Sequence, residues 1–195
     1  MIGNDIVDLK EASLTSNWER PGFLNKVFSP EEQRLLHTSS NPFQTVWRMW
    51  SMKESAYKFY LQKTATPIKG FYPAKVICEC YSPTHGQVTI QGLVVETTSI
   101  IHPEYIFSTA FSNVNIPTET AIFFLSEKNY QFQTTFVRDK LLDFLVQKKQ
   151  LNKIDLTVEK NQHNIPEIFY KKKPLPIACS LTHHGNYGGF SLSSI

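Results

Sequence analysis

The helix predicted over residues 43–61 constrains this chain most, because it places charges among aromatic side chains. The segment contains no Gly or Pro, and Trp50, Glu54, Lys58 and Leu61 recur at steps of three and four residues. Side chains with this spacing share one face of a helix. A buried charge is costly unless a partner compensates it. A surface Glu–Lys pair four residues apart has the same spacing, so the pattern alone leaves both interpretations open.

Length and composition predict a globular chain with a substantial core. With 195 residues and 41% hydrophobic residues, it has room for one large domain or two small halves. No apolar run is long enough to span a bilayer, and the N-terminus does not resemble a signal peptide, so we expect a cytoplasmic protein. The odd number of cysteines, three, predicts no disulfide framework.

The net charge of +3 is too small to indicate nucleic-acid binding, but its distribution is uneven. Residues 1–118 carry ten basic and ten acidic side chains, whereas residues 119–195 carry ten basic and seven acidic ones. The excess positive charge therefore lies in the C-terminal part. A small anionic ligand, an acidic protein partner or a solvated face would each suit this distribution.

The hydrophobic pattern predicts two successive units, each with strands around one main helix. In the first unit we expect a strand at 2–9, a short helix within 17–28, a helix starting at Ser29, the long helix, and a meander of strands at 74–81, 87–96 and 104–111. After a loop at 113–117, we expect a strand at 120–125, a helix at 134–150, a strand at 155–159, a turn at 164–166, and strands at 174–182 and 190–195. The prediction is an α+β fold with pseudo-symmetric halves, residues 1–117 and 118–195. Each half would pack a small antiparallel sheet on its main helix, and together they would form one active-site unit.

Two aspartates stand out in the N-terminal strand, because Asp is disfavoured in strands. Asp5 lies among apolar residues, and it either faces water at a sheet edge or has a functional role. Asp8 is placed to cap the element that follows it.

Three separate stretches together resemble the 4′-phosphopantetheinyl transferase superfamily. Residues 3–8, Gly-Asn-Asp-Ile-Val-Asp, resemble the family's Gly-x-Asp-Ile-x-Glu strand. Residues 50–58 match its Trp-x-x-Lys-Glu-(Ala/Ser)-x-x-Lys helix at every fixed position. Residues 180–185, Ser-Leu-Thr-His-His-Gly, resemble its Ser-hydrophobic-Ser-His-x-Gly segment, with Thr182 in place of the second Ser. Weaker likenesses extend the resemblance over nearly the whole chain.

The order of the motifs resembles that of the small, trimeric holo-acyl-carrier-protein synthases. The larger, surfactin-type enzymes carry the histidine half first, yet this chain is long enough to hold both halves. The resemblance therefore implies a fused pseudo-dimer in permuted order that works as a monomer.

The resemblance implies transfer of 4′-phosphopantetheine from coenzyme A to a serine of an apo acyl or peptidyl carrier protein, releasing adenosine 3′,5′-bisphosphate. Asp5 and Glu54 match the family's Mg²⁺-binding pair, and Glu54, or a water it holds, would be the general base. Lys58 would contact the phosphates. His183, Ser180 and Thr182 would also bind coenzyme A. We expect His184 to be an ordinary loop residue.

Some positions depart from the family pattern. Val7 stands where many larger members have a second acid, and Asp8 should point away from Asp5 on an ideal strand. Residues 164–166 are Asn-Ile-Pro where the larger members have Gly-Lys-Pro, so either the affinity for coenzyme A is lower or another lysine replaces the missing one. Lys171, Lys172 and Lys173 are candidates among which the sequence does not choose.

The expected partners are coenzyme A and an acidic carrier protein, with neither nucleic acid nor a membrane. A carrier of fatty-acid biosynthesis fits the synthase resemblance, and polyketide or peptide carriers fit the same motifs. Candidates for docking, chosen by position, are Lys10, Arg20, Lys26 and Phe28. The alternative hypothesis is a non-catalytic relative that binds carrier protein or coenzyme A without turnover.

Overall fold

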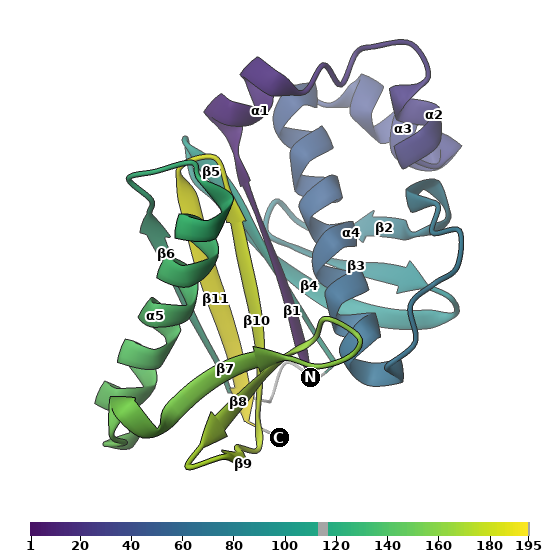
Figure 1. Ribbon diagram of the computed structural model, residues 1–195. Helices are drawn as coiled ribbons and strands as arrows, with labels where there is room; N and C mark the ends of the chain where they lie inside the picture. Colours follow the sequence, from purple (N-terminus) through teal and green to yellow (C-terminus); the bar gives the residue numbers. More distant parts are fainter. Residues whose placement is uncertain (113–116, 195) are drawn as a thin grey trace.

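Two antiparallel sheets with one long helix each form the frame of this α+β fold (Figure 1). The computed structural model describes residues 1–112 and 117–194, so most of the loop predicted at 113–117 lies outside the described residues. The strand order is β1-β5-β4-β3-β2 in the first sheet and β10-β11-β6 in the second. A third, small sheet has the order β7-β8-β9. The predicted fold class is confirmed.

The first half contains the longest helix, α4 (Pro42–Thr64), and the five-stranded sheet. Its strands are β1 (Ile2–Asp8), β2 (Ile77–Cys80), β3 (His85–Ile90), β4 (Leu93–Ile101) and β5 (Tyr105–Phe111). Three short helices cover one end, namely α1 (Leu9–Thr15), α2 (Phe23–Val27) and α3 (Pro30–Thr38), and a 3₁₀ turn, η1 (Pro73–Lys75), precedes β2. Ser29 and Glu32 form the predicted capping box at the start of α3.

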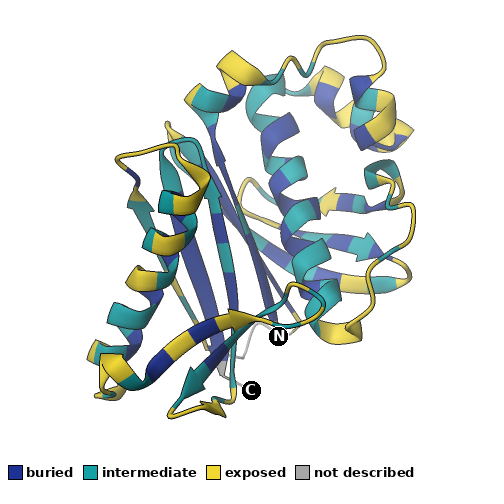
Figure 2. Ribbon diagram, in the orientation of Figure 1, coloured by how far each residue is buried: buried dark blue, intermediate teal, exposed yellow. Residues whose placement is uncertain are grey.

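The second half contains α5 (Tyr130–Lys149) and the two three-stranded sheets. Its strands are β6 (Thr118–Phe124), β7 (Leu156–Lys160), β8 (Pro166–Tyr170), β9 (Lys173–Pro174), β10 (Ile177–His184) and β11 (Tyr187–Ser194), and η2 (Lys153–Asp155) precedes β7. Each half has its own buried apolar cluster, and Figure 2 shows buried residues along α4, β1 and the strands beside α5. No helix within 1–112 or 117–194 is both long and apolar enough to cross a bilayer.

Some predicted boundaries were wrong. The strand expected at 87–96 is a hairpin, because Gln91 and Gly92 both have positive φ angles, 50° and 76°, as a two-residue hairpin turn requires. The histidine segment, read as a loop, continues β10 through His184, and only Gly185 and Asn186 separate β10 from β11. The hairpin of β8 and β9 was not predicted.

The two halves meet along β1 and β10, which lie side by side without a backbone ladder between them (Figure 1). Side chains of β10 instead accept hydrogen bonds from alternate backbone amides of β1. Ser180 Oγ accepts from Asn4 N at 3.0 Å, Thr182 Oγ1 from Ile6 N at 3.2 Å, and His184 Nδ1 from Asp8 N at 2.9 Å. We call these three bonds the β1–β10 seam. The constant offset of 176 residues means that the two strands run parallel.

At both ends of β1, a glycine allows another part of the chain to pack closely. A Cβ on Gly3 would lie 1.9 Å from the Ser55 carbonyl oxygen, so only glycine lets β1 approach α4 this closely. A Cβ on Gly185 would lie 2.3 Å from Asp8 Oδ2. Asp8 is fixed there, because its Oδ1 accepts from Glu11 N and its Oδ2 from Asn186 N.

We expect Gly185→Ala to destabilise the protein by about 2–3 kcal/mol, through steric overlap with Asp8 and a φ of +57°. Gly22→Ala is the matched control, since Gly22 has φ +80° but a Cβ there meets no atom within 4 Å. This control should lose only about 1 kcal/mol, the cost of the left-handed conformation. Urea unfolding of both variants measures the difference in unfolding free energy. Equal losses of stability would show that residue 185 does not pack tightly against Asp8.

Candidate active site

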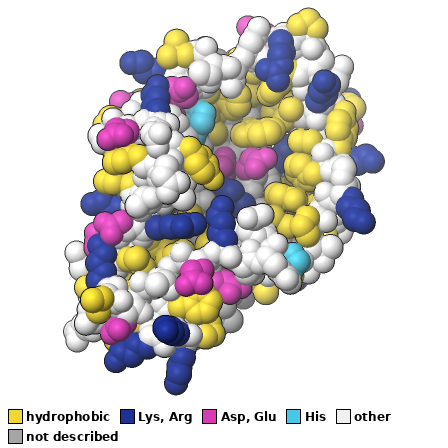
Figure 3. Space-filling view, in the orientation of Figure 1, with side chains coloured by type: hydrophobic (Ala, Val, Ile, Leu, Met, Phe, Trp, Pro, Cys, Tyr) yellow, Lys and Arg dark blue, Asp and Glu magenta, His cyan; other side chains and the backbone are white. Residues whose placement is uncertain are grey.

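A pocket of about 380 Å³ lies between β1, α4 and the segment from α1 to α2. We call it the carboxylate pocket, and its lining includes Asp5, Glu54, Trp50, Arg20, His183 and His184. Figure 3 shows this face of the molecule hollowed, with acidic side chains on the floor of the hollow and hydrophobic side chains beside them.

Burial and mutual repulsion oppose ionisation of the two carboxylates in this pocket. The pKa of Glu54 is raised to about 7, mainly by burial and further by the negative charge of Asp5, while the charge of Lys58 opposes both effects. Burial likewise raises the pKa of Asp5, although Lys58 and a hydrogen bond from Thr182 favour its charged form. Ionising two buried carboxylates this close to each other costs free energy. Such pairs are a feature of sites that bind a cation or move a proton.

Lys58 connects Asp5 to a second pocket. Its ammonium group donates to the Asn4 carbonyl oxygen at 2.8 Å and lies 3.4 Å from Asp5 Oδ1. Lys58 follows Glu54 by one helical turn, the spacing of an ordinary surface Glu–Lys pair. That interpretation is incomplete, because the Lys58 ammonium group also contacts Asn4 and Asp5 of β1. The side chain of Asp5 is only 14% exposed, which makes its contact with Lys58 partly shielded from water.

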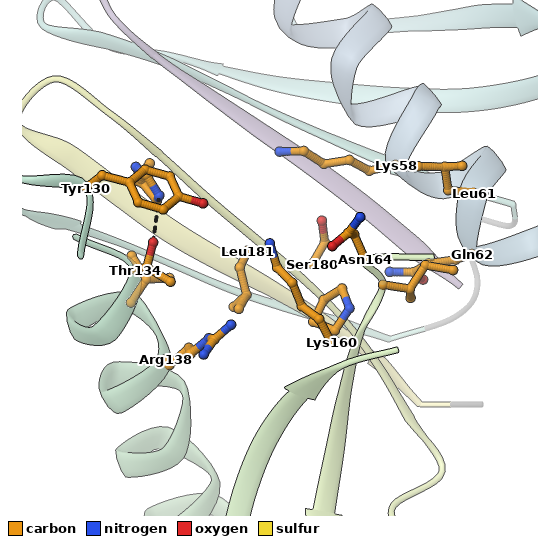
Figure 4. A pocket seen from close by; sticks show the side chains of 14 residues that line it. Lys58, Leu61, Gln62, Tyr130, Thr134, Arg138, Lys160, Asn164, Ser180 and Leu181 are labelled. Atoms are coloured by element: carbon orange, nitrogen blue, oxygen red, sulfur yellow. Dashed lines mark hydrogen bonds between the residues drawn. The ribbon is translucent and has the colours of Figure 1, made fainter. Parts of the chain in front are cut away.

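The second pocket, of about 170 Å³, lies between the two halves (Figure 4). We call it the basic pocket, and its lining includes Lys58, Tyr130, Arg138, Lys160, Ser180 and His183. Figure 4 shows Lys58 from α4, Arg138 from α5 and Lys160 from β7 directed toward the same space. Arg138 Nε is buried and has no hydrogen-bond partner in the described part of the chain. The Arg138 guanidinium group lines this pocket, and a cationic group there suits an anionic ligand.

His183 lines both pockets and is held by α5. Its Nε2 lies 3.4 Å from the Thr134 hydroxyl, and the ring of Tyr130 packs edge-on against it at 5.4 Å. Burial, aided by the charge of Lys58, lowers the pKa of His183, so its neutral form is favoured. A neutral imidazole between the pockets can still donate one hydrogen bond to an oxygen.

The structure brings most of the predicted residues together at the junction of the two pockets. Asp5, Glu54, Lys58 and His183 all line one pocket or the other, and Ser180 lines the basic pocket from within the seam. Thr182 is 5% exposed and is bonded to Ile6 and Asp5 rather than open to the basic pocket. The carboxylate oxygens of Asp8 accept hydrogen bonds from the backbone amides of Glu11 and Asn186.

Other candidates lie elsewhere. Phe28, a candidate for docking, is 1% exposed in the core and cannot contact a partner, so that prediction was wrong. Lys171 and Lys172 form the turn between β8 and β9 and line a different, open depression. Val7 lines the carboxylate pocket and offers no oxygen ligand.

Sequence reasoning missed Arg138, Lys160 and His184. Arg138 carried no motif, although it follows the buried Val137 on the predicted helix. Lys160 ends β7 and pairs with Pro166 of the turn where the missing lysine was expected, and both residues line the basic pocket. His184 continues the alternation of Ser180 and Thr182, which is visible once residues 180–184 are read as a strand.

Comparison with models of known protein families identifies one family. The sequence model of the 4′-phosphopantetheinyl transferase superfamily matches residues 1–110. A holo-[acyl-carrier-protein] synthase from Neisseria meningitidis is similar in structure, with 16% identity and a TM-score of 0.45 over 56% of this chain and 94% of that one. The synthase from Thermotoga maritima has 11% identity and a TM-score of 0.43 over 89% and 83% of the chains. That from Plasmodium yoelii has 14% identity and a TM-score of 0.41 over 56% and 90%. Among curated proteins, no sequence matches.

Proposed function

Because the chain belongs to the 4′-phosphopantetheinyl transferase superfamily, we propose that it transfers 4′-phosphopantetheine from coenzyme A to a serine of an apo carrier protein. The single observation that supports this most is the junction of two pockets at Asp5 and Lys58. One pocket has cationic groups that suit a phosphorylated nucleotide, and the other has carboxylates that suit proton removal. A transfer from one substrate to another needs both at one junction.

The basic pocket is proposed to bind coenzyme A. Lys58, Arg138, Lys160 and His183 offer charged or polar donors to its phosphates, and Ser180 lies in the same wall. Lys160 would replace the lysine that the Asn-Ile-Pro turn lacks. Thr182, also expected to bind coenzyme A, contacts Ile6 and Asp5 instead.

The two carboxylates fit a divalent cation. Mg²⁺ usually takes one or two carboxylates together with substrate phosphates and waters. Across residues 1–112 and 117–194, no group of three acidic, histidine or cysteine side chains could hold a metal alone, so substrate oxygens would complete the coordination. When bound beside Asp5 and Glu54, Mg²⁺ would neutralise phosphate charge. The pKa of Glu54 is raised mainly by burial and further by the charge of Asp5, and such a cation would offset both effects.

The proposed reaction is a displacement at the β-phosphorus of coenzyme A. The serine oxygen forms a bond to this phosphorus, and the bond from phosphorus to the bridging oxygen breaks. The departing adenosine 3′,5′-bisphosphate keeps that electron pair, while the serine proton passes to the Glu54 carboxylate directly or through water. Lys58 holds a fixed positive charge beside the reacting phosphates.

Both halves contribute to the basic pocket, which supports a monomer as the working unit. Lys58 comes from the first half, and Arg138, Lys160 and His183 come from the second. The carrier protein would reach the carboxylate pocket beside Arg20 and Trp50, where a cation and an apolar ring face solvent-accessible space. Charge complementarity with an acidic carrier would mainly set the encounter rate.

Intact-protein mass spectrometry tests the proposed function directly. We expect an apo acyl carrier protein, incubated with this protein, coenzyme A and Mg²⁺, to gain the mass of one phosphopantetheine. The gain should disappear with a chelator, because the carboxylate pair would lack its cation. Carriers from fatty-acid, polyketide and peptide synthesis would rank the partners. Binding of coenzyme A without a mass gain on any carrier would instead support a non-catalytic relative.

A further inference from the structure

The Thr182 hydroxyl makes two contacts, one on the backbone of β1 and one on a side chain. Its oxygen accepts a hydrogen bond from Ile6 N at 3.2 Å and lies 3.3 Å from Asp5 Oδ1. Thr182 is 5% exposed, and the neighbours Leu181 and His183 line the basic pocket while Thr182 does not. Its side chain therefore faces β1 rather than the proposed coenzyme A site.

The direction of the hydroxyl proton follows from its partners. A backbone N–H can only donate, so the Thr182 oxygen acts as the acceptor toward Ile6. A hydroxyl has one proton and two lone pairs. The proton is therefore free to point at Asp5 Oδ1, which can only accept when ionised. Lys58 Nζ lies 3.4 Å from the same oxygen, so two donors converge on Oδ1.

The other carboxylate oxygen of Asp5, Oδ2, has a different environment. None of the described residues donates a hydrogen bond to Oδ2, while Asp5 lines the carboxylate pocket beside Glu54. Donors that hold one oxygen of a carboxylate fix the orientation of the whole group. The second oxygen then remains available as a ligand.

We propose that Thr182 is a positioning residue, which orients the Asp5 carboxylate for a divalent cation while joining the two halves of the chain. This inference rests on the proposed function, because the cation is the one proposed for the transfer reaction. It assigns Thr182 to the metal side of the site and not to coenzyme A. The residue thereby couples cation binding in the first half to the strand that carries His183.

The seam provides a matched control. Ser180 makes the equivalent contact with Asn4 N at 3.0 Å but has no contact with Asp5. Ser180→Ala therefore removes one seam bond without touching the carboxylate. Thr182→Val removes the hydroxyl at nearly constant volume, and Thr182→Ser keeps it. Circular dichroism melting would check the fold of each variant.

The experiment measures Mn²⁺ binding to the complete chain by electron paramagnetic resonance, with adenosine 3′,5′-bisphosphate affinity measured separately by calorimetry without metal. We expect Thr182→Val to weaken Mn²⁺ binding about tenfold, as typically follows loss of a group that orients a ligand. Thr182→Ser and Ser180→Ala should retain the wild-type Mn²⁺ affinity. Metal-free nucleotide affinity should be unchanged in Thr182→Val.

Two results would overturn the inference. One is an unchanged Mn²⁺ affinity in Thr182→Val, and the other is a loss of nucleotide affinity without metal, which would place Thr182 in the coenzyme A site. If Thr182→Val does not fold, Thr182→Ala answers the same question, because it places no methyl group against the carboxylate. The metal measurements need no turnover. Failure of the wild-type protein to modify any carrier would therefore refute the proposed function without deciding the role of Thr182.

Discussion

Replacing Glu54 by Gln is expected to lower single-turnover transfer by about a thousandfold, the usual contribution of a general base, with any lost metal affinity in addition. The substitution keeps the shape of the side chain but removes its charge and its ability to take a proton. The measurement is phosphopantetheine transfer to an apo carrier protein at saturating coenzyme A and Mg²⁺. Near-normal turnover in this assay would show that Glu54 is neither the base nor a metal ligand.

The same substitution should stabilise the metal-free protein, which separates a functional role from a structural one. The pKa of Glu54 is about 7 in the folded protein and starts from an ordinary value of 4.5. The unfolded chain loses this proton first, so folding stability falls as pH rises from about 4.5 to about 7. Above pH 7 the full cost of the buried charge is present.

We therefore expect Glu54→Gln to gain on the order of 2 kcal/mol in unfolding free energy at pH 8 and little at pH 4.5. This gain in unfolding free energy is smaller than the full pKa shift of Glu54 would give, because Glu54 is partly accessible to water and water screens its charge. Glu19→Gln, at an exposed carboxylate outside the helices, is the matched control and should change little at either pH. Equal effects of Glu54→Gln at both pH values would contradict the raised pKa. Mg²⁺ should raise the melting temperature of the wild-type protein more than that of Glu54→Gln.

Local patterns predicted the elements of the site well, because these patterns act over a few residues. The spacing of Trp50, Glu54 and Lys58 marked one helical face, and the capping box at Ser29 is present as expected. Asp5 in an apolar strand signalled a group with a special role, and the family match confirms the recognition made from the three motifs. The roles of the individual site residues stay predictions.

The contacts that join distant segments were not predictable from periodicity. His184 bonds to Asp8 across 176 residues, and no local pattern reports which backbone amide a histidine will meet. Arg138 and Lys160 enter the basic pocket from different elements, so only the packing of α5 and β7 brings them together. The consecutive lysines at 171–173 attracted attention by composition, yet Lys171 and Lys172 form a hairpin turn and Lys173 begins β9.

Lys53 shows how a motif can hide a structural role beside a functional one. It precedes Glu54, yet its side chain is only 1% exposed and lines neither the carboxylate pocket nor the basic pocket. Lys53 Nζ donates to the Val27 carbonyl at 2.7 Å, to Glu32 Oε2 at 2.8 Å and to the Pro73 carbonyl at 3.0 Å. These bonds tie α4 to the end of α2, to α3 and to η1.

Glu32 is equally committed to this network. Its Oε2 also accepts from Ser29 N at 2.7 Å, and its Oε1 accepts from Cys78 N at 2.7 Å. The capping carboxylate of α3 thus bonds to the first sheet and to α4 at once. A buried pair with all its hydrogen bonds made can be close to neutral for stability, whereas loss of one partner is costly.

We accordingly expect Lys53→Met to destabilise the protein by about 3–5 kcal/mol, because it leaves the Glu32 carboxylate buried without a counter-charge and removes the donor to two carbonyl groups. Lys63→Met, an exposed lysine on the same helix, is the matched control and should change stability by less than about 0.5 kcal/mol. Chemical denaturation of both variants gives the comparison. The double variant Lys53→Met/Glu32→Gln should lose less stability than the sum of the single variants, since the unpaired charge is then absent. A loss below about 1 kcal/mol in Lys53→Met would mean that water reaches Glu32 and replaces the ammonium. In that case the presence of Lys53 in the motif would need a functional explanation in the active site rather than a structural one in the fold.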